Sequence, residues 1–341
     1  MRATVSKLLF ALTALAIVSC EEWNVEMDTE IMRDGSCVRT VKTDNSNCLA
    51  PDEGWQKQII KDSVRTFSRD TIHTAIMSRN FDKVEDMNAF PALQLSGKPV
   101  SSEATLDKSF KWFYTDYTFT ETFKGWQDAF DIPLTDYVSE DEASFWYTGY
   151  PELPEGITGQ ELDYLSDISF ETDHWSYDVG WDIYFRSVAH YYDLIENAPV
   201  DRETFLSMRD SVMKAAWEDD MDFFDDGGAL VFLDRFFHTG AYSEFLDCGE
   251  FNDYLTVLYQ HGLGLNNLKV SYTLRMPGKV TDAGRGKIED GVIRYRFGGA
   301  YLIPGDYTFT ATSRCVNVWA FLLAGLVITV AVGSFFIGKK N

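Results

Sequence analysis

Hydrophobic and polar residues alternate with a period of two in both flanks of the chain, which predicts β-strands. Residues 23–43 alternate around Asp34 and Gly35, a pair that suits the tight turn of a hairpin. Residues 110–123 give the strongest strand pattern, because Thr and aromatic residues dominate them. One face of that strand would carry Tyr117, Phe119, Glu121 and Phe123. Further strands are predicted over 268–276, 292–297 and 306–314.

Between residues 126 and 262 the hydrophobic spacing changes to three and four residues, which predicts a helical section. Ser139 with Glu142 has the spacing of a capping box at a helix N-terminus. A shorter helix is predicted after the first hairpin, where Pro51 and Asp52 suit a helix start. Its hydrophobic face would carry Trp55, Ile59, Ile60, Val64 and Phe67.

These patterns predict an α+β fold class. We expect an antiparallel sheet with a packed helix, a large all-α insertion and one C-terminal transmembrane helix. Strands far apart in the sequence must pair for this fold to form. The predicted parts are a lipoprotein signal peptide (1–19), the N-terminal half of the α+β domain (20–124), the helical insertion (125–264), the C-terminal strands of the α+β domain (265–315), the transmembrane helix (316–338) and a cytoplasmic tail (339–341).

The C-terminal segment has the composition of a membrane span. Residues 318–337 contain no charged side chain. At a rise of about 1.5 Å per residue, such a helix would cover a hydrocarbon core of about 30 Å. Trp319 suits the membrane interface, and Lys339 and Lys340 predict a cytoplasmic C-terminus.

The N-terminus reads as a secretory signal, with Arg2 and Lys7 before an apolar stretch that is too short for a membrane anchor. It ends in Ile17-Val18-Ser19-Cys20, which resembles a bacterial lipobox. That resemblance implies acylation of Cys20, the alternative being an ordinary signal peptide with an incidental cysteine. We therefore expect a protein of the bacterial cytoplasmic membrane, lipid-anchored and single-pass, with its main domain extracytoplasmic on the periplasmic or outer face. Two ends held at one surface would make the first and last strands neighbours.

The charge balance narrows the classes of partner. The chain has 341 residues with 30 basic and 53 acidic side chains, a formal net charge of −23. Binding to a nucleic-acid backbone requires an excess of Lys and Arg, so nucleic-acid partners are excluded. A hydrophobic content of 45% excludes a disordered acidic chain.

No motif of an enzyme or a cofactor site is present in the sequence. The five histidines lack the spacing of metal ligands, and there is no Gly-x-Ser-x-Gly, phosphate-binding or dinucleotide-binding motif. We therefore predict no enzymatic activity, no catalytic residue and no cofactor. Asp219, Asp222 and Asp226 lie in an acidic cluster that could hold Ca²⁺, although a solvated helix end explains the same cluster.

Aromatic and cysteine residues leave alternatives open. The tryptophans could stack sugars in a groove or fill a core; those considered are Trp112, Trp126, Trp146, Trp175, Trp181 and Trp217. Beyond Cys20, the disulfide candidates are Cys37, Cys48, Cys248 and Cys315. An extracytoplasmic setting permits disulfides, and four cysteines allow three pairings, among which the sequence does not choose.

The C-terminal third resembles the LppM-type envelope lipoprotein domain. The matching residues are 272–280 (YTLRMPGKV), 292–297, 312–314 and 317–319, together with the N-terminal hairpin. The resemblance implies a lipoprotein with a C-terminal helix, a fold similar to lipid-binding helix-grip domains and an amphiphile cavity between sheet and helix. The family offers no counterpart for residues 126–262, and Tyr295 stands where Trp is expected.

These features predict a membrane-anchored, non-enzymatic bacterial envelope lipoprotein that binds a lipid or amphiphile, or an envelope protein. One alternative is a scaffold or assembly partner of an envelope complex that docks through the helical insertion. Another is a glycan-binding or glycan-acting protein, which would require carboxylates flanking an aromatic-lined cleft.

Overall fold

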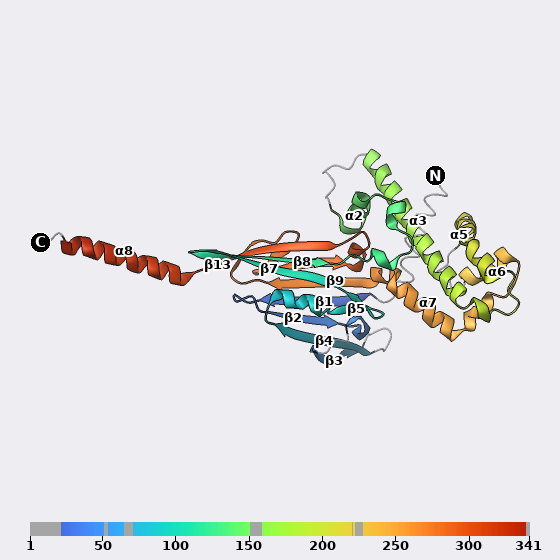
Figure 1. Ribbon diagram of the computed structural model, residues 1–341, viewed down its shortest axis with the longest axis horizontal. Coiled ribbons are helices and arrows are strands. Elements are labelled where there is room, and N and C mark those ends of the chain that lie inside the picture. Colours follow the sequence, from blue (N-terminus) through green and yellow to red (C-terminus); the bar gives the residue numbers. More distant parts are fainter. Residues whose placement is uncertain are drawn as a thin grey trace.

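The computed structural model describes residues 22–50, 54–64, 71–150, 159–219, 221 and 228–338. A two-sheet sandwich forms the middle of the molecule, a helical region lies at one end, and helix α8 (Val318–Gly338) extends from the other (Figure 1). The predicted signal peptide 1–19, Cys20 and the tail 339–341 lie outside the described residues.

The larger sheet has seven strands and is mixed rather than antiparallel. Its order is β11-β12-β9-β1-β2-β4-β3. The strands are β1 (Trp23–Ile31), β2 (Cys37–Thr43), β3 (Gln56–Val64), β4 (Thr71–Phe81), β9 (Leu268–Arg275), β11 (Lys287–Glu289) and β12 (Val292–Gly298). The hairpin β1–β2 confirms the prediction for 23–43. The central pair β1–β9 is parallel, with Val25 opposite Val270, so distant segments do pair.

The smaller sheet has four strands in the order β10-β13-β8-β7. They are β7 (Ser102–Lys111), β8 (Tyr114–Phe123), β10 (Lys279–Asp282) and β13 (Tyr307–Val316), and β5 (Leu93–Leu95) pairs with β6 (Lys98–Val100) in a separate ribbon. The single strand predicted over 110–123 is corrected at its start, because β7 ends at Lys111 and β8 begins at Tyr114 after a hairpin turn. The predicted face of the remaining strand is confirmed, since Tyr117, Phe119, Glu121 and Phe123 are all buried. Strand β13 pairs with β8, which lies almost 200 residues earlier in the chain.

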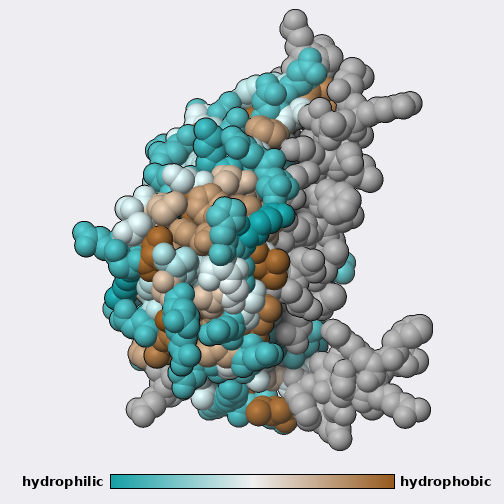
Figure 2. Space-filling model, turned by 90° about the vertical axis from the view of Figure 1, so that its right-hand side faces the viewer, coloured by the Kyte–Doolittle hydropathy of each residue, from teal (hydrophilic) through white to brown (hydrophobic). Residues whose placement is uncertain are grey.

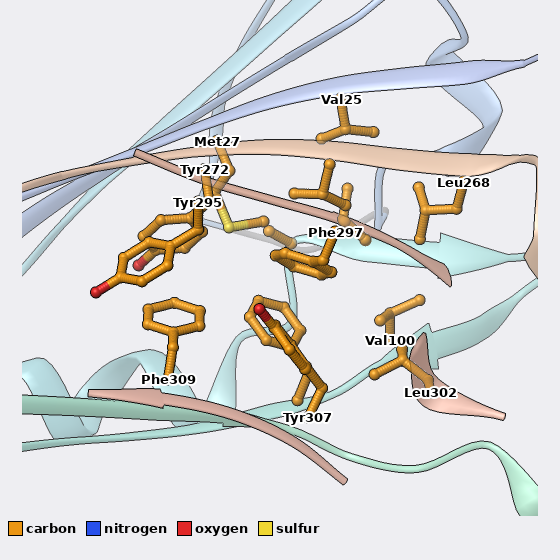
Figure 3. Close-up of a cluster of buried hydrophobic side chains, with 14 of the residues drawn as sticks. Val25, Met27, Val100, Leu268, Tyr272, Tyr295, Phe297, Leu302, Tyr307 and Phe309 are labelled. Carbon is orange, nitrogen blue, oxygen red and sulfur yellow. The ribbon is translucent and has the colours of Figure 1, made fainter. Parts of the chain in front are cut away.

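Aromatic side chains fill the space between the two sheets (Figure 3). Tyr295 of the larger sheet stacks on Phe309 of the smaller one, with ring centroids 4.1 Å apart, and Tyr272 meets Phe309 edge-on at 4.9 Å. Phe297 contacts Tyr307 at 5.0 Å. Each buried ring of this size contributes about 1.5–3 kcal/mol through the apolar area it removes from water.

One ion pair lies inside this core. Arg39 Nη2 donates to Glu121 Oε2 at 2.7 Å, and Arg39 Nε donates to Thr29 Oγ1 at 3.1 Å. Tyr272 donates its hydroxyl hydrogen to the same Glu121 oxygen at 2.7 Å, and Ser102 donates to Oε1 at 2.7 Å. Burial alone lowers the pKa of Arg39, but the charge of Glu121 raises it above its ordinary value. The pair therefore joins the two sheets.

The helical region packs around its own core. Its helices are α2 (Glu140–Thr148), α3 (Gly159–His190), α4 (Arg202–Ser207), α5 (Arg209–Glu218), α6 (Gly228–Phe237) and α7 (Gly249–His261). Across the whole of the described chain, the short 3₁₀ turns are η1 (Ser46–Cys48), η2 (Val84–Ala89), η3 (Gln127–Ala129), η4 (Leu134–Asp136), η5 (Tyr192–Leu194), η6 (Ser243–Asp247), η7 (Leu263–Asn267) and η8 (Gly299–Leu302). Ser139 and Glu142 form the predicted capping box of α2. Phe185 stacks on Phe205 at 4.2 Å inside this second core.

The predicted helix over 51–67 is wrong where the structure describes it. Residues 56–64 form the edge strand β3, which pairs antiparallel with β4. Ile59 is 62% exposed, so the three- and four-residue spacing did not mark a buried helical face. Pairing with β4 satisfies the backbone groups on one side of this segment, and β-branched Ile59 is compatible with a strand.

The predicted packing of a helix on the sheet is also corrected. The partner layer of the seven-stranded sheet is the four-stranded sheet, because both inner faces carry the aromatic residues of one shared core. The first and last strands are not neighbours: β1 belongs to the larger sheet and β13 to the smaller one. Trp23 pairs with Leu268 at the end next to the helical region, whereas β13 runs away from that end toward α8 (Figure 1).

No helix among the described residues is both long enough and apolar enough to cross a membrane, which contradicts the transmembrane helix predicted over 316–338. The fold is thus α+β, with a mixed sheet and helices.

Candidate ligand-binding groove

A groove of about 460 Å³ opens in the helical region, within the size range of ligand pockets. Three segments line it: the loop that precedes α2, the middle of α3, and α5. The lining residues are Asp131, Ile132, Pro133, Asp136, Tyr137, His174, Asp178, Arg209, Asp210, Met213, Lys214 and Trp217. This end of the molecule shows hydrophobic residues grouped near its middle, with hydrophilic residues around them (Figure 2).

Buried Trp175 holds the loop against α3. Its Nε1 donates to the carbonyl oxygen of Ile132 at 2.9 Å, and its ring meets Phe130 edge-on at 4.9 Å. Asp131 pairs with Arg186 of α3 at 2.7 Å. These contacts fix the loop against α3, so the side chains of the loop that line the groove are held in place before any ligand binds.

Asp182 of α3 holds the first residue of α5. Its Oδ1 accepts from Arg209 Nε at 2.9 Å and from Arg209 Nη2 at 2.6 Å, while its Oδ2 lies 2.8 Å from Arg186 Nε. Asp182 is buried, and such charge-assisted bonds are stronger than neutral ones. Steps of four along α5 then bring Met213 and Trp217 to the same groove-lining face as Arg209.

An aromatic wall forms one side of the groove. The rings of His174 and Trp217 stack with centroids 4.1 Å apart and an interplanar angle of 27°. Tyr137 meets His174 edge-on at 5.3 Å, and Tyr177 meets Trp217 edge-on at 5.0 Å. These contacts define the position of the Trp217 indole, which is half-buried and faces the groove.

Carboxylates outnumber cations among the lining residues. Asp131, Asp136, Asp178 and Asp210 face Arg209 and Lys214. Tyr137 donates its hydroxyl hydrogen to Asp178, and Asp178 also lies 3.6 Å from His174 Nε2. The Asp210 side chain is 94% exposed. The groove therefore offers several oxygen acceptors beside aromatic rings, with a net negative lining.

Burial is the first cause that raises the pKa of Tyr137, and the adjacent Asp178 carboxylate is the second. Tyr137 thus stays a phenol and a hydrogen-bond donor at neutral pH. Its role here is to orient Asp178 toward the groove. The groove therefore combines a fixed acceptor, Asp178, with rigid aromatic rings, an arrangement suited to binding a ligand.

The predicted Ca²⁺ residues receive little support. Asp219 pairs with Arg235, and Asp222 and Asp226 lie outside the described residues. Among the residues that are described, no cluster of three or more His, Cys, Asp or Glu side chains could hold a metal ion. The charge of Asp219 is balanced by the guanidinium group of Arg235 rather than by a metal ion.

The four described cysteines are free thiols. Cys37, Cys48 and Cys315 are buried, and Cys248 is half-buried. Cys37 begins β2, whereas Cys48 follows its far end in η1, so the length of the strand separates them. Burial raises the pKa of Cys37 to about 11, which keeps it a thiol.

The six tryptophans considered from the sequence have separate roles. Trp126, Trp175 and Trp181 are buried, Trp112 and Trp146 are exposed, and only Trp217 among them lines the groove. Sequence reasoning missed Tyr137, His174, Asp178 and Arg209. The one local signal for them was the four-residue step from His174 to Asp178, which places both on one face of a helix.

Fold and groove together define an α+β sandwich protein with an attached helical region that carries a polar, aromatic-walled groove. No protein-family model matches the chain, and no curated protein or solved structure is similar to it. The resemblance to the LppM-type domain therefore stays a prediction from its short motifs.

Proposed function

We propose that this protein is a non-enzymatic lipoprotein of the bacterial envelope whose groove binds a saccharide. The signal sequence and the lipobox-like Ile17–Cys20 support attachment through an acyl chain on Cys20. The observation that carries the binding function is the groove itself, where carboxylates and the Tyr137–His174–Trp217 wall converge from three segments.

A saccharide fits this chemistry better than other small ligands. Its ring carries C–H groups that pack against aromatic side chains, and its hydroxyls donate to carboxylates. Four carboxylates against two cations disfavour a phosphate or another anionic group. A neutral, hydroxyl-rich ring satisfies the acceptors without adding charge.

An amphiphile is less well matched to the described interior. An acyl chain gains nothing from contact with carboxylates, because the charged groups would lose water without receiving hydrogen bonds. Between the two sheets, aromatic side chains occupy the core (Figure 3). The groove therefore suits a saccharide better than an amphiphile.

The test is titration of the full-length protein in detergent with neutral oligosaccharides, including N-acetylglucosamine oligomers, glucans and mannans, followed by tryptophan fluorescence and calorimetry. We expect one member of the panel to bind, and Trp217→Ala to weaken it at least ten-fold. Trp146→Ala removes an exposed tryptophan outside the groove and serves as the matched control.

Binding that Trp217→Ala leaves unchanged would contradict the groove assignment, and a failure of the whole panel would contradict the ligand class. Chromatography of the ligand after overnight incubation checks the absence of catalysis. Recovery of shortened oligosaccharides would show a glycan-acting enzyme instead.

A further inference from the structure

At the end of the sandwich opposite the helical region, five aromatic side chains remain exposed. Phe110 comes from the end of β7, Trp112 and Phe113 from the turn between β7 and β8, and Trp319 and Phe321 from the start of α8; these five are the aromatic tip. Figure 1 shows this end of the sandwich, where α8 begins. They are 40–59% exposed. Residues of this type are normally buried, so a grouped set in water indicates an interaction site.

Hydrogen bonds fix the conformation of the tip. Asn317 accepts from Thr115 Oγ1 at 3.2 Å, donates from Nδ2 to the Trp112 carbonyl at 3.1 Å, and donates from its backbone to the Phe113 carbonyl at 2.9 Å. One residue therefore ties the hairpin turn to the first turn of α8.

The rings of the tip also contact one another. Phe110 stacks on Trp319 at 6.2 Å with an interplanar angle of 3°, and Trp112 meets Trp319 edge-on at 5.4 Å. Trp112 itself has φ of +27°, a strained value for a residue with a side chain. The ring contacts hold the two half-exposed indoles side by side.

The charge around the tip is opposite to that of the chain. The turns and strand ends near the tip are residues 32–36, 107–116, 275–279 and 314–317. Gly35 lies close to Lys108 and Gly278 lies close to Arg314, so these segments lie beside one another. They carry the basic residues Arg33, Lys108, Lys111, Arg275, Lys279 and Arg314 against Asp34, Asp107 and Asp116, and Arg275 also pairs with Asp28 and lies opposite Glu30 of β1. Six basic and five acidic side chains thus give this end a local charge of +1 on a chain with a net charge of −23.

We propose that the aromatic tip and the basic residues around it form a contact site for the surface of an anionic phospholipid bilayer. Indole rings settle at headgroup depth, and Lys and Arg are attracted to anionic headgroups. A second copy of the chain meeting tip to tip would bring two basic ends together, which like charges oppose. The contact lies at the interface and does not depend on a saccharide in the groove.

The experiment reconstitutes the full-length protein into vesicles of phosphatidylcholine with one quarter phosphatidylglycerol and measures tryptophan quenching by brominated phosphatidylcholine. We expect strong quenching that falls at least two-fold in the double variant Trp112→Phe/Trp319→Phe. Trp146→Phe, an exposed tryptophan of the helical region, is the matched control and should leave the quenching unchanged. Lys111→Gln/Lys279→Gln should reduce the gain in quenching that phosphatidylglycerol gives over pure phosphatidylcholine.

Equal quenching in the parent, the double variant and the control would overturn the proposal. Crosslinking between two chains through a Trp112→Cys variant without lipid would overturn it in favour of a second copy. All substituted residues are exposed, and an unchanged urea midpoint verifies that the variants fold. A negative result here leaves the saccharide titration unaffected, and the reverse also holds, because Trp217 lies in the other end region.

Discussion

The sandwich and the helical region each place a buried carboxylate beside guanidinium groups, but they differ in what water can reach. In the sandwich, the side chains of Glu121 and Arg39 are 0% and 5% exposed. In the helical region, Asp182 is 5% exposed, but its partner Arg209 is 33% exposed and lines the groove. A guanidinium–carboxylate pair is thus closed to solvent in the sandwich and partly open to solvent in the helical region.

This difference separates a structural role from a binding role. A closed pair must be satisfied entirely by protein groups, and Glu121 receives Arg39, Tyr272 and Ser102. An open pair needs only one fixed partner, so Arg209 is positioned by Asp182 and still presents its remaining surface to a ligand. The accessibility of the cation, rather than the type of residue, distinguishes the two.

The largest effect is expected when the closed pair is broken. Glu121→Ala leaves the Arg39 guanidinium buried without its counter-charge, which should lower the free energy of unfolding by about 3–5 kcal/mol. Urea denaturation of the full-length protein in detergent measures it. If the loss stayed below that of the open pair, the distinction between the two pairs would be wrong.

A double variant provides the control for this prediction. Arg39→Met together with Glu121→Leu removes both charges and keeps hydrophobic volume, so most of the lost stability should return. Lack of recovery would show that Tyr272 or the packing around it, rather than the unpaired charge, accounts for the loss.

The open pair should be less costly to break and should affect binding. Asp182→Ala exposes Arg209 and Arg186 to water that can replace the carboxylate, so we expect a loss of about 1–3 kcal/mol. Saccharide affinity should fall about ten-fold, because Arg209 loses its anchor. Asp193→Ala, whose partner Arg202 is 4.0 Å away at the surface, is the control for both measurements.

A carboxyl without a guanidinium sharpens the comparison further. Burial raises the pKa of Asp173 in α3 from 3.8 to about 6. Between these values the folded protein binds more protons than the unfolded one, so stability falls as pH rises from about 4 to about 6. Because the side chain is only half-buried, we expect about 1–2 kcal/mol. Asp173→Asn should remove this part of the pH dependence and stabilise the protein at pH 7.

Exposed Asp167 on the same helix provides the matched variant, Asp167→Asn. Its stability curve between pH 4 and pH 6 should follow that of the parent protein. A slope that survives in Asp173→Asn would assign the pH dependence to another group.

The sequence predicted what depends on local periodicity. Alternation in 110–123 placed Glu121 among buried aromatic residues, and the hairpin followed from Asp34 and Gly35. It could not name Arg39 as the partner of Glu121, because that contact depends on the packing of two sheets. The parallel β1–β9 pair and the edge strand β3 were missed for the same reason: long-range pairing fixes both.

The groove was only partly predictable. Trp217 was considered as a sugar-stacking residue, but its neighbours Tyr137 and His174 lie 80 and 43 positions earlier in the chain. They meet only because Trp175 and Asp182 hold the loop and α5 against α3. Such contacts have no signature in composition or spacing.

The smallest effect is expected for a guanidinium–carboxylate fork at the surface. Arg314 donates to both oxygens of Asp116, at 2.6 Å from Nε and 3.2 Å from Nη2, whereas Arg39 makes one hydrogen bond to Glu121. The Arg314 bond is the main cause that lowers the pKa of Asp116. Asp116→Asn should nevertheless leave the urea midpoint unchanged within error at pH 7, since water solvates both partners when the pair opens. A loss comparable to that of Glu121→Ala would mean that bond geometry, rather than burial, determines the strength of these pairs, and the contrast between the closed and open clusters would no longer hold.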